Sequence, residues 1–197
     1  MTTHTKEWLL GGVLVAAIAL ELLFIAARPA HAAVADWWQG ASMVPQGQND
    51  FGSANFNQSL QDLAATGANS VGLVYPIYQD NGQSSSLHAG WNTPSDASLR
   101  TAIQQAHALG LKVNLKLHAE VHDGTWRAWI KPNDRNAWYG SYNFHLMKLA
   151  NIAQEEHVEM ITVGTEMVSV AAWSEHGENT QKWQEMIGNV SQFTQAS

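Results

Sequence analysis

The chain has 197 residues, of which 45% are hydrophobic and 14% are charged, and its formal net charge is −7. These values are typical of one globular domain or of part of a larger one. The ten Lys and Arg residues are scattered singly and form no basic stripe, so we expect no nucleic-acid partner. The absence of Cys excludes a disulfide framework.

Residues 1–35 differ in composition from the rest of the chain. An apolar run from Trp8 to Leu20 is followed by Glu21, a second apolar run and the small-residue sequence AHA. This pattern is typical of a secretory signal that is cleaved after Ala32, with Ala35 as the alternative site.

An uncleaved membrane anchor is the alternative for the same segment. Residues 8–27 are about long enough to span a bilayer. We favour cleavage, because Glu21 near the middle of such a span would cost about 2.5–3.5 kcal/mol on insertion. The sequence therefore predicts a signal peptide at 1–32 and an exported domain at 33–197, located outside the cell, in the periplasm or in the cell envelope.

From residue 36 onward, short apolar runs alternate with amphipathic stretches that end at helix-stopping glycines such as Gly67 and Gly110. Thr93 and Pro94 are typical of the start of a helix. The expected elements are a strand at 36–43, a helix at 53–67, a strand at 70–78, a helix at 93–110, a strand at 111–121, a helix at 136–157, a strand at 159–166 and a helix at 178–195.

Four strand-then-helix units in strict alternation predict a parallel sheet. Two α/β architectures fit this order: a small doubly wound sheet, and the first half of a (β/α)₈ TIM barrel, which takes about 250 residues in full. In a barrel, the residues after each strand form one active-site face. Here these residues are Tyr78, Gln79, Asp80, His118, Glu120, His122, Asp123 and Glu166.

Several spaced motifs bear a family resemblance. They are YPIYQDN, TPSDASLRTAIQQAHALGLKVNLKLHAEVHDGTWRAWIKPND, AWYGSY and ITVGTE. From about Trp37 to its end, the chain resembles glycoside hydrolase family 113, the β-mannanase-like (β/α)₈ enzymes of the retaining clan A. The resemblance implies the N-terminal half of a TIM barrel, with about four βα units, and a mannan-type polysaccharide or oligosaccharide as substrate.

The resemblance also implies roles for individual residues. Glu166 matches the general acid/base at the end of strand four, and Lys116 and His118 match residues that line the sugar site. Glu120 and the DGTWR loop, Asp123 to Arg127, match as well. Two positions depart from the pattern: Leu117 stands where the family often has Pro, and Thr165 stands where many clan members have a sugar-binding Asn.

The chemistry of retaining glycosidases explains why these residue types are needed. Two carboxyl groups about 5–5.5 Å apart act as acid/base and nucleophile. Glu166 suits the acid role if the apolar strand end raises its pKa. We expect Tyr78, Trp126 and Trp129 to offer flat faces to sugar rings, and Thr165 to contact the substrate. No cofactor is expected.

The second carboxylate has no counterpart in this chain. In the family it is a Glu at the end of strand seven, and no residue here maps to it. We therefore expect this chain to be the N-terminal part of a longer enzyme and to be inactive alone.

Three alternatives remain open at this point. The chain could be a non-catalytic, carbohydrate-binding half barrel. It could be a metal-dependent hydrolase that uses a cluster of His88, His118, Glu120, His122 and Asp123. Glu166 could also be a structural carboxylate that is paired with Lys116.

Overall fold

The computed structural model describes residues 37–172 and 174–194. The predicted signal peptide at 1–32 and the alternative anchor at 8–27 lie outside these residues. Among the helices of the described ranges, none has the length and apolar character that crossing a membrane requires.

The predicted alternation of strands and helices is confirmed. The principal elements are β1 (Gly40–Met43), α2 (Ala54–Ala65), β2 (Ser70–Gln79), α3 (Asp96–Ala108), β3 (Lys112–Val121), α4 (Arg135–Glu155), β4 (Met160–Thr162), α5 (Val168–Ala171) and α6 (Asn179–Thr194), with short 3₁₀ turns η1 (Asp50–Gly52) and η2 (Arg127–Trp129). β4 is shorter than predicted, and α5 was not predicted. The differences lie on both sides of Glu166.

The order of the strands decides between the two predicted architectures. The sheet runs β1-β2-β3-β4, and each neighbouring pair is parallel. A doubly wound sheet reverses its strand order at a switch point, where ligands bind. Here every connection steps the same way, which is the progression of consecutive barrel strands.

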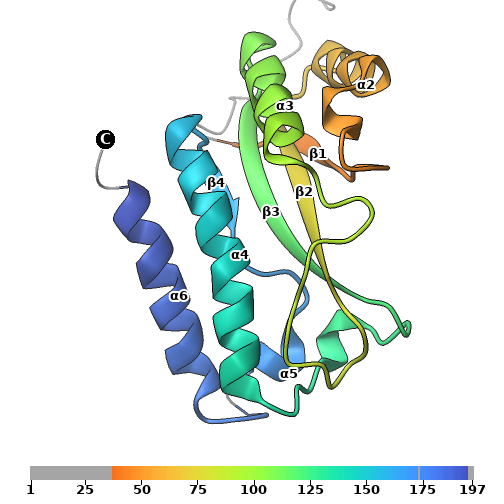
Figure 1. The fold of residues 1–197 in the computed structure, drawn as a ribbon. Coiled ribbons are helices and arrows are strands. Elements are labelled where there is room, and N and C mark those ends of the chain that lie inside the picture. The colour runs from red at the N-terminus through yellow and green to blue at the C-terminus, as the bar shows by residue number, and fades with distance from the viewer. Residues whose placement is uncertain (1–36, 173, 195–197) are drawn as a thin grey trace, which may run out of the picture. The chain divides into compact units, whose positions relative to one another are not determined.

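The two faces of β3 differ in character, because successive side chains of a strand point to opposite faces. Val113, Leu115, Leu117 and Ala119 are buried in the core, and α3 and α4 lie in front of the sheet in Figure 1. The alternate residues Asn114, Lys116, His118 and Glu120 are only partly buried. β3 thus carries an apolar face toward the helices and a polar face on the other side.

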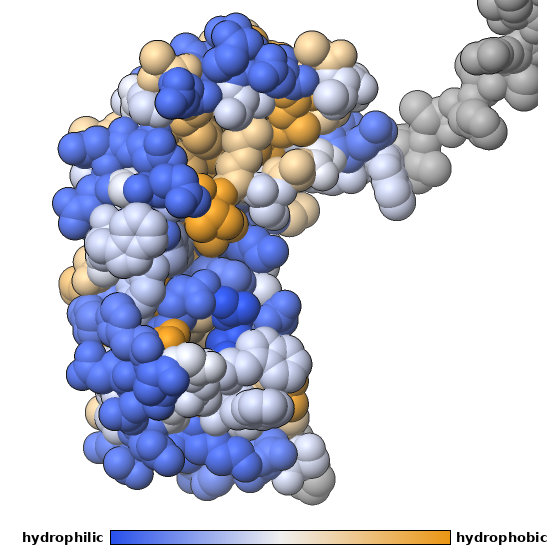
Figure 2. All heavy atoms as spheres, turned by 90° about the vertical axis from the view of Figure 1, so that its right-hand side faces the viewer, coloured by the Kyte–Doolittle hydropathy of each residue, from blue (hydrophilic) through white to orange (hydrophobic). Residues whose placement is uncertain are grey.

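The surface agrees with this division. The side of the molecule shown in Figure 2 is mainly hydrophilic, and apolar residues show only in small patches. Many large apolar side chains are packed between sheet and helices, with Trp138, Tyr142 and Leu115 among those fully buried.

The start of α3 differs from the prediction. Ser95, not Thr93, caps the helix: its hydroxyl accepts a hydrogen bond from the Ser98 amide at 3.3 Å. The Thr93 hydroxyl is buried and donates to the carbonyl of Pro76 at 2.6 Å. Thr93 therefore fastens the loop that follows β2 to the strand itself.

Candidate active site

The backbone after β4 places Glu166 at the carboxyl end of the sheet. β4 pairs with β3 only as far as Thr162. The chain then passes the indole of Trp183 so closely that a Cβ on Gly164 would lie 2.6 Å from the ring. Glu166 itself has a φ of 57°, a left-handed conformation that is uncommon outside glycine. Such conformations persist only where the surrounding structure holds them in place, and they are found most often at functional sites.

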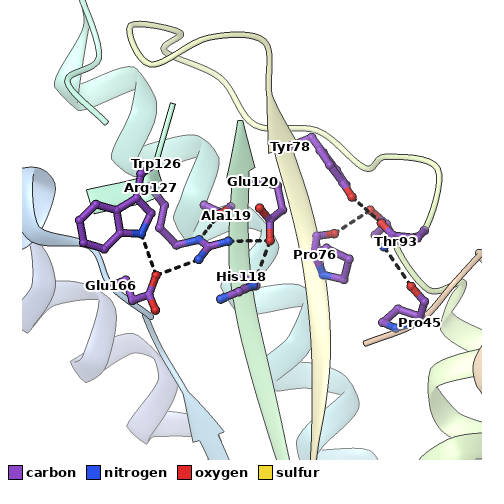
Figure 3. A network of polar contacts seen from close by, with 11 residues as sticks. Pro45, Pro76, Tyr78, Thr93, His118, Ala119, Glu120, Trp126, Arg127 and Glu166 are labelled. Carbon is purple, nitrogen blue, oxygen red and sulfur yellow. Dashed lines mark hydrogen bonds and ion pairs between the residues drawn. The ribbon is translucent and has the colours of Figure 1, made fainter. Parts of the chain in front are cut away.

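Two donors hold the side chain of Glu166. The Trp126 indole N–H and Nη1 of Arg127 both donate to Glu166 Oε2, each at 2.9 Å (Figure 3). The side chain is 50% exposed, so the carboxylate faces solvent while one oxygen is fully engaged. The alternative pairing of Glu166 with Lys116 therefore does not form, and the cationic partner of Glu166 is Arg127.

Arg127 joins Glu166 to a second carboxylate. Its Nη2 donates to Glu120 Oε1 at 2.7 Å, and its Nε donates to the carbonyl of Ala119 at 2.8 Å. His118 Nδ1 lies 3.1 Å from the same Oε1 of Glu120. Because the guanidinium is only 15% exposed and planar, it fixes both carboxylates in one geometry. The four side chains form one connected network across β3 and the end of β4.

The pKa of Glu166 is shifted in the direction opposite to the one predicted. The hydrogen bond from Trp126 and then that from Arg127 lower the pKa of Glu166 below the ordinary value of a glutamate. The predicted increase is wrong, because Glu166 lies in the open beside a cation and not in an apolar strand end. Burial alone would raise the pKa of Glu120, but its hydrogen bond with His118 and the charge of Arg127 leave that pKa lowered. Both carboxylates are therefore ionised near neutral pH.

Lys116 lies on the same polar face as this network. It stands on β3 between Val74 of β2 and Thr162 of β4, two residues before His118. Within the described residues, its ammonium group has no hydrogen bond or ion pair. The ammonium group of Lys116 is therefore free to contact a ligand on the polar face of the sheet.

Tyr78 and Thr165 are less open than predicted. Tyr78 is only 8% exposed, its ring stacks on His122 with centroids 4.9 Å apart, and its hydroxyl donates to Asn92 at 2.6 Å. The Thr165 hydroxyl is buried and has no hydrogen-bond partner in the part of the chain that the structure describes. Neither side chain presents an open surface to a sugar in this arrangement.

Exposed tryptophans lie beside Glu166. Trp126 is 48% exposed and Trp129 is 64% exposed, and their rings meet edge to face with centroids 5.5 Å apart. Trp126 therefore combines a hydrogen bond to Glu166 with an open aromatic face. Amphipathic aromatic side chains of this kind suit the mixed polar and apolar surface of a ligand.

The metal cluster that was left open as an alternative does not form. His118 pairs with Glu120, whereas the His122 ring lies between Tyr78 and His88. Over residues 37–172 and 174–194, no three His, Asp or Glu side chains are grouped so that they could hold a metal ion. The metal-dependent reading therefore has no support from this arrangement.

The comparison with protein families is decisive. The model of Glycoside Hydrolase Family 113 matches residues 42–195. The chain belongs to glycoside hydrolase family 113. Its sheet order and the carboxylate at the end of β4 agree with the resemblance that the sequence motifs carry.

Solved structures of family 113 proteins share the fold. A β-1,4-mannanase of the family, in a complex, matches with a TM-score of 0.71 and 27% identity over 79% of this chain and 53% of that one. The β-mannanase AaManA from Alicyclobacillus acidocaldarius, in complex with ManMIm, matches with a TM-score of 0.69 and 28% identity over 80% of this chain and 52% of that one. The chain thus spans about half the length of these mannanases. A comparison with curated protein sequences gave no match.

Within this member of family 113, Arg127 is the one residue of the network that was not predicted individually. It was expected only as part of the DGTWR loop, although the neighbouring Trp126 was among the predicted sugar-binding residues. One sequence feature could have indicated Arg127: it directly follows Trp126 in the loop after the strand that carries His118 and Glu120. Their contact with Glu166 joins residues 39 and 40 positions apart, which no local pattern encodes.

Proposed function

We propose that this chain acts in the retaining hydrolysis of a β-mannan-type polysaccharide, with Glu166 as the general acid/base. One observation carries the proposal: in a family 113 chain, Glu166 stands at the carboxyl end of β4, fixed by Trp126 and Arg127 and open to solvent. Lys116, His118 and Glu120 line the same face of the sheet and provide polar contacts for sugar hydroxyls.

The hydrogen bonds to Glu166 determine which oxygen carries the proton. Oε2 accepts from both Trp126 and Arg127, so an acidic proton has to reside on Oε1. In the first step this proton passes to the glycosidic oxygen as its bond to the anomeric carbon breaks and the nucleophilic carboxylate bonds to that carbon. In the second step Glu166 removes a proton from a water molecule, and that water's oxygen displaces the nucleophilic carboxylate from the anomeric carbon.

The low pKa of Glu166 in the free protein favours the second step. For the first step, the group has to gain a proton when the substrate binds. A sugar that covers the half-exposed carboxylate removes water from it, and loss of water raises the pKa of a carboxyl group. Substrate binding would thus convert Glu166 from a carboxylate into an acid.

A second carboxyl group is required as nucleophile about 5–5.5 Å from the first. The family resemblance places it at the end of strand seven, so cleavage by the whole protein is part of the proposal. ¹H NMR of the anomeric protons during digestion of mannohexaose tests it. We expect the β-anomer as the first product, and an α-anomer that appears first would contradict retention.

The second candidate function is carbohydrate binding without cleavage. The lowered pKa of Glu166 in the free protein favours it, because an ionised carboxylate has no proton to donate. Titration calorimetry distinguishes the two candidates. Binding of mannohexaose by the whole protein, with no product after prolonged incubation, supports binding alone, whereas product formation rejects it.

We also propose that residues 1–32 direct export to the cell envelope or beyond. The apolar run and the following AHA sequence support this proposal. Expression with a C-terminal epitope and fractionation tests it: we expect a shortened product outside the cytoplasm. A full-length, membrane-bound product would instead indicate the anchor at 8–27, and a full-length cytoplasmic product would reject export.

A further inference from the structure

The loop between β2 and α3 presents an exposed tryptophan on a fixed backbone. Trp91 is 61% exposed, whereas the next two residues, Asn92 and Thr93, are 5% and 4% exposed. Trp91 thus presents an open aromatic face on a loop whose neighbouring polar side chains are buried.

Side-chain hydrogen bonds fix the loop on both sides of Trp91. The Thr93 hydroxyl accepts from the Gly90 amide at 2.7 Å and donates to the carbonyl of Pro76 at 2.6 Å. Asn92 donates to the carbonyl of Pro45 at 2.9 Å and accepts from the Tyr78 hydroxyl at 2.6 Å (Figure 3). The backbone that carries Trp91 is thus attached to β2 and to the segment after β1.

Gly90 brings this loop against Tyr78. A Cβ at position 90 would lie 2.2 Å from the Tyr78 ring, so only glycine allows the approach. The buried Tyr78 ring therefore supports the loop from below instead of contacting a ligand itself. Because the loop is held in place before binding, Trp91 can contact a ligand at a low cost in conformational entropy.

The position of the loop relates Trp91 to the carboxylates. Tyr78 pairs in register with Glu120 on β3, and Arg127 links Glu120 to Glu166 after β4. In Figure 3, Tyr78 and Trp126 lie on opposite sides of Glu120. β2 and β4 are two strand spacings apart, or about 10 Å, which is more than one pyranose ring. A ligand that reaches from Glu166 to the Tyr78 side must therefore have several units.

We propose that Trp91 forms a separate sugar-binding position, where its indole stacks on the apolar face of a pyranose ring in a glycan that also occupies the Glu166 site. This inference rests on the proposed function and adds a second contact point, at Trp91, for the glycan chain.

Calorimetric titration of the full chain with mannobiose and with mannohexaose tests this position. Trp91→Ala should weaken mannohexaose binding about tenfold, or about 1.4 kcal/mol, and leave mannobiose binding at Glu166 unchanged. Trp91→Phe should restore most of the loss. Phe144→Ala is the matched control, since Phe144 is 68% exposed on α4, and it should leave both affinities unchanged.

The outcomes separate this position from the proposed function. Unchanged mannohexaose binding in Trp91→Ala, with normal binding by the wild type, overturns the Trp91 position alone. An equal loss for both oligosaccharides also overturns it, because the residue would then act on the Glu166 site as a whole. A wild-type protein that binds neither oligosaccharide overturns both proposals.

Discussion

In the whole protein, replacement of Glu166 by glutamine is expected to lower kcat for mannohexaose hydrolysis by about 10²–10⁴-fold, the usual contribution of a positioned acid/base. The amide oxygen of glutamine can still accept hydrogen bonds from Trp126 and Arg127, so the local geometry should persist. The amide cannot give a proton to the glycosidic oxygen or take one from water. Steady-state kinetics of the wild type and of Glu166→Gln measure the effect.

The leaving group provides an internal check on this prediction. The leaving group of an activated aryl mannoside departs without protonation. Glycosylation of the Glu166→Gln variant by such a substrate should therefore be nearly normal. Glu185→Gln is the control, because Glu185 is an exposed carboxylate on α6 whose partners are Gln181 and Lys182. Near-normal hydrolysis of mannohexaose by Glu166→Gln would reject the acid/base role.

Replacement of Arg127 by glutamine is expected to release both carboxylates and to lower kcat by about 100-fold, the cost of misplacing a reacting group by about 1 Å. Removing the cation disfavours the ionised forms, so the pKa values of Glu166 and Glu120 should both rise. Glu166 would then keep its proton to a higher pH. The alkaline limb of the kcat/KM profile, where the acid loses its proton, should therefore shift upward in pH.

Two variants control for the Arg127 prediction. Arg127→Lys keeps the charge but cannot bridge two carboxylates with a planar fork, so it should restore the pKa of Glu166 more fully than kcat. Arg100 also contacts two carboxylates, Glu155 and Glu156, but at the opposite end of α4. Arg100→Gln should leave the pH profile unchanged. A profile that does not move in Arg127→Gln would show that Arg127 has only a structural role.

The fold could be predicted well, because its signals are local. Apolar periodicity and glycine stops predict all four strands and every helix except the short α5 without knowledge of distant residues. The choice between the two α/β architectures could not be made in this way. It depends on the order in which strands pair, and Asn114 of β3 pairs with Met160 of β4 over a long stretch of chain.

The residues that form the site could be predicted from the sequence, but the direction of the pKa shift of Glu166 could not. His118, Glu120, Trp126 and Glu166 were all expected at one edge, and the structure joins them in one network. The pKa of Glu166 was predicted in the wrong direction, because its exposure and its bond to Arg127 come from tertiary structure. The early end of β4 and the left-handed backbone at Glu166 turn the side chain out of the apolar strand.

The state of Glu166 with and without sugar tests the whole account most directly. ¹³C NMR of side-chain carboxyl groups, with Glu166 assigned by its loss in Glu166→Gln, gives its pKa in the free protein and in the presence of mannohexaose. We expect a pKa below the ordinary glutamate value in the free protein and a clear increase when the sugar covers the carboxylate. An ordinary or raised pKa in the free protein, unchanged by mannohexaose, would contradict both the Arg127 network and the placement of the sugar at Glu166.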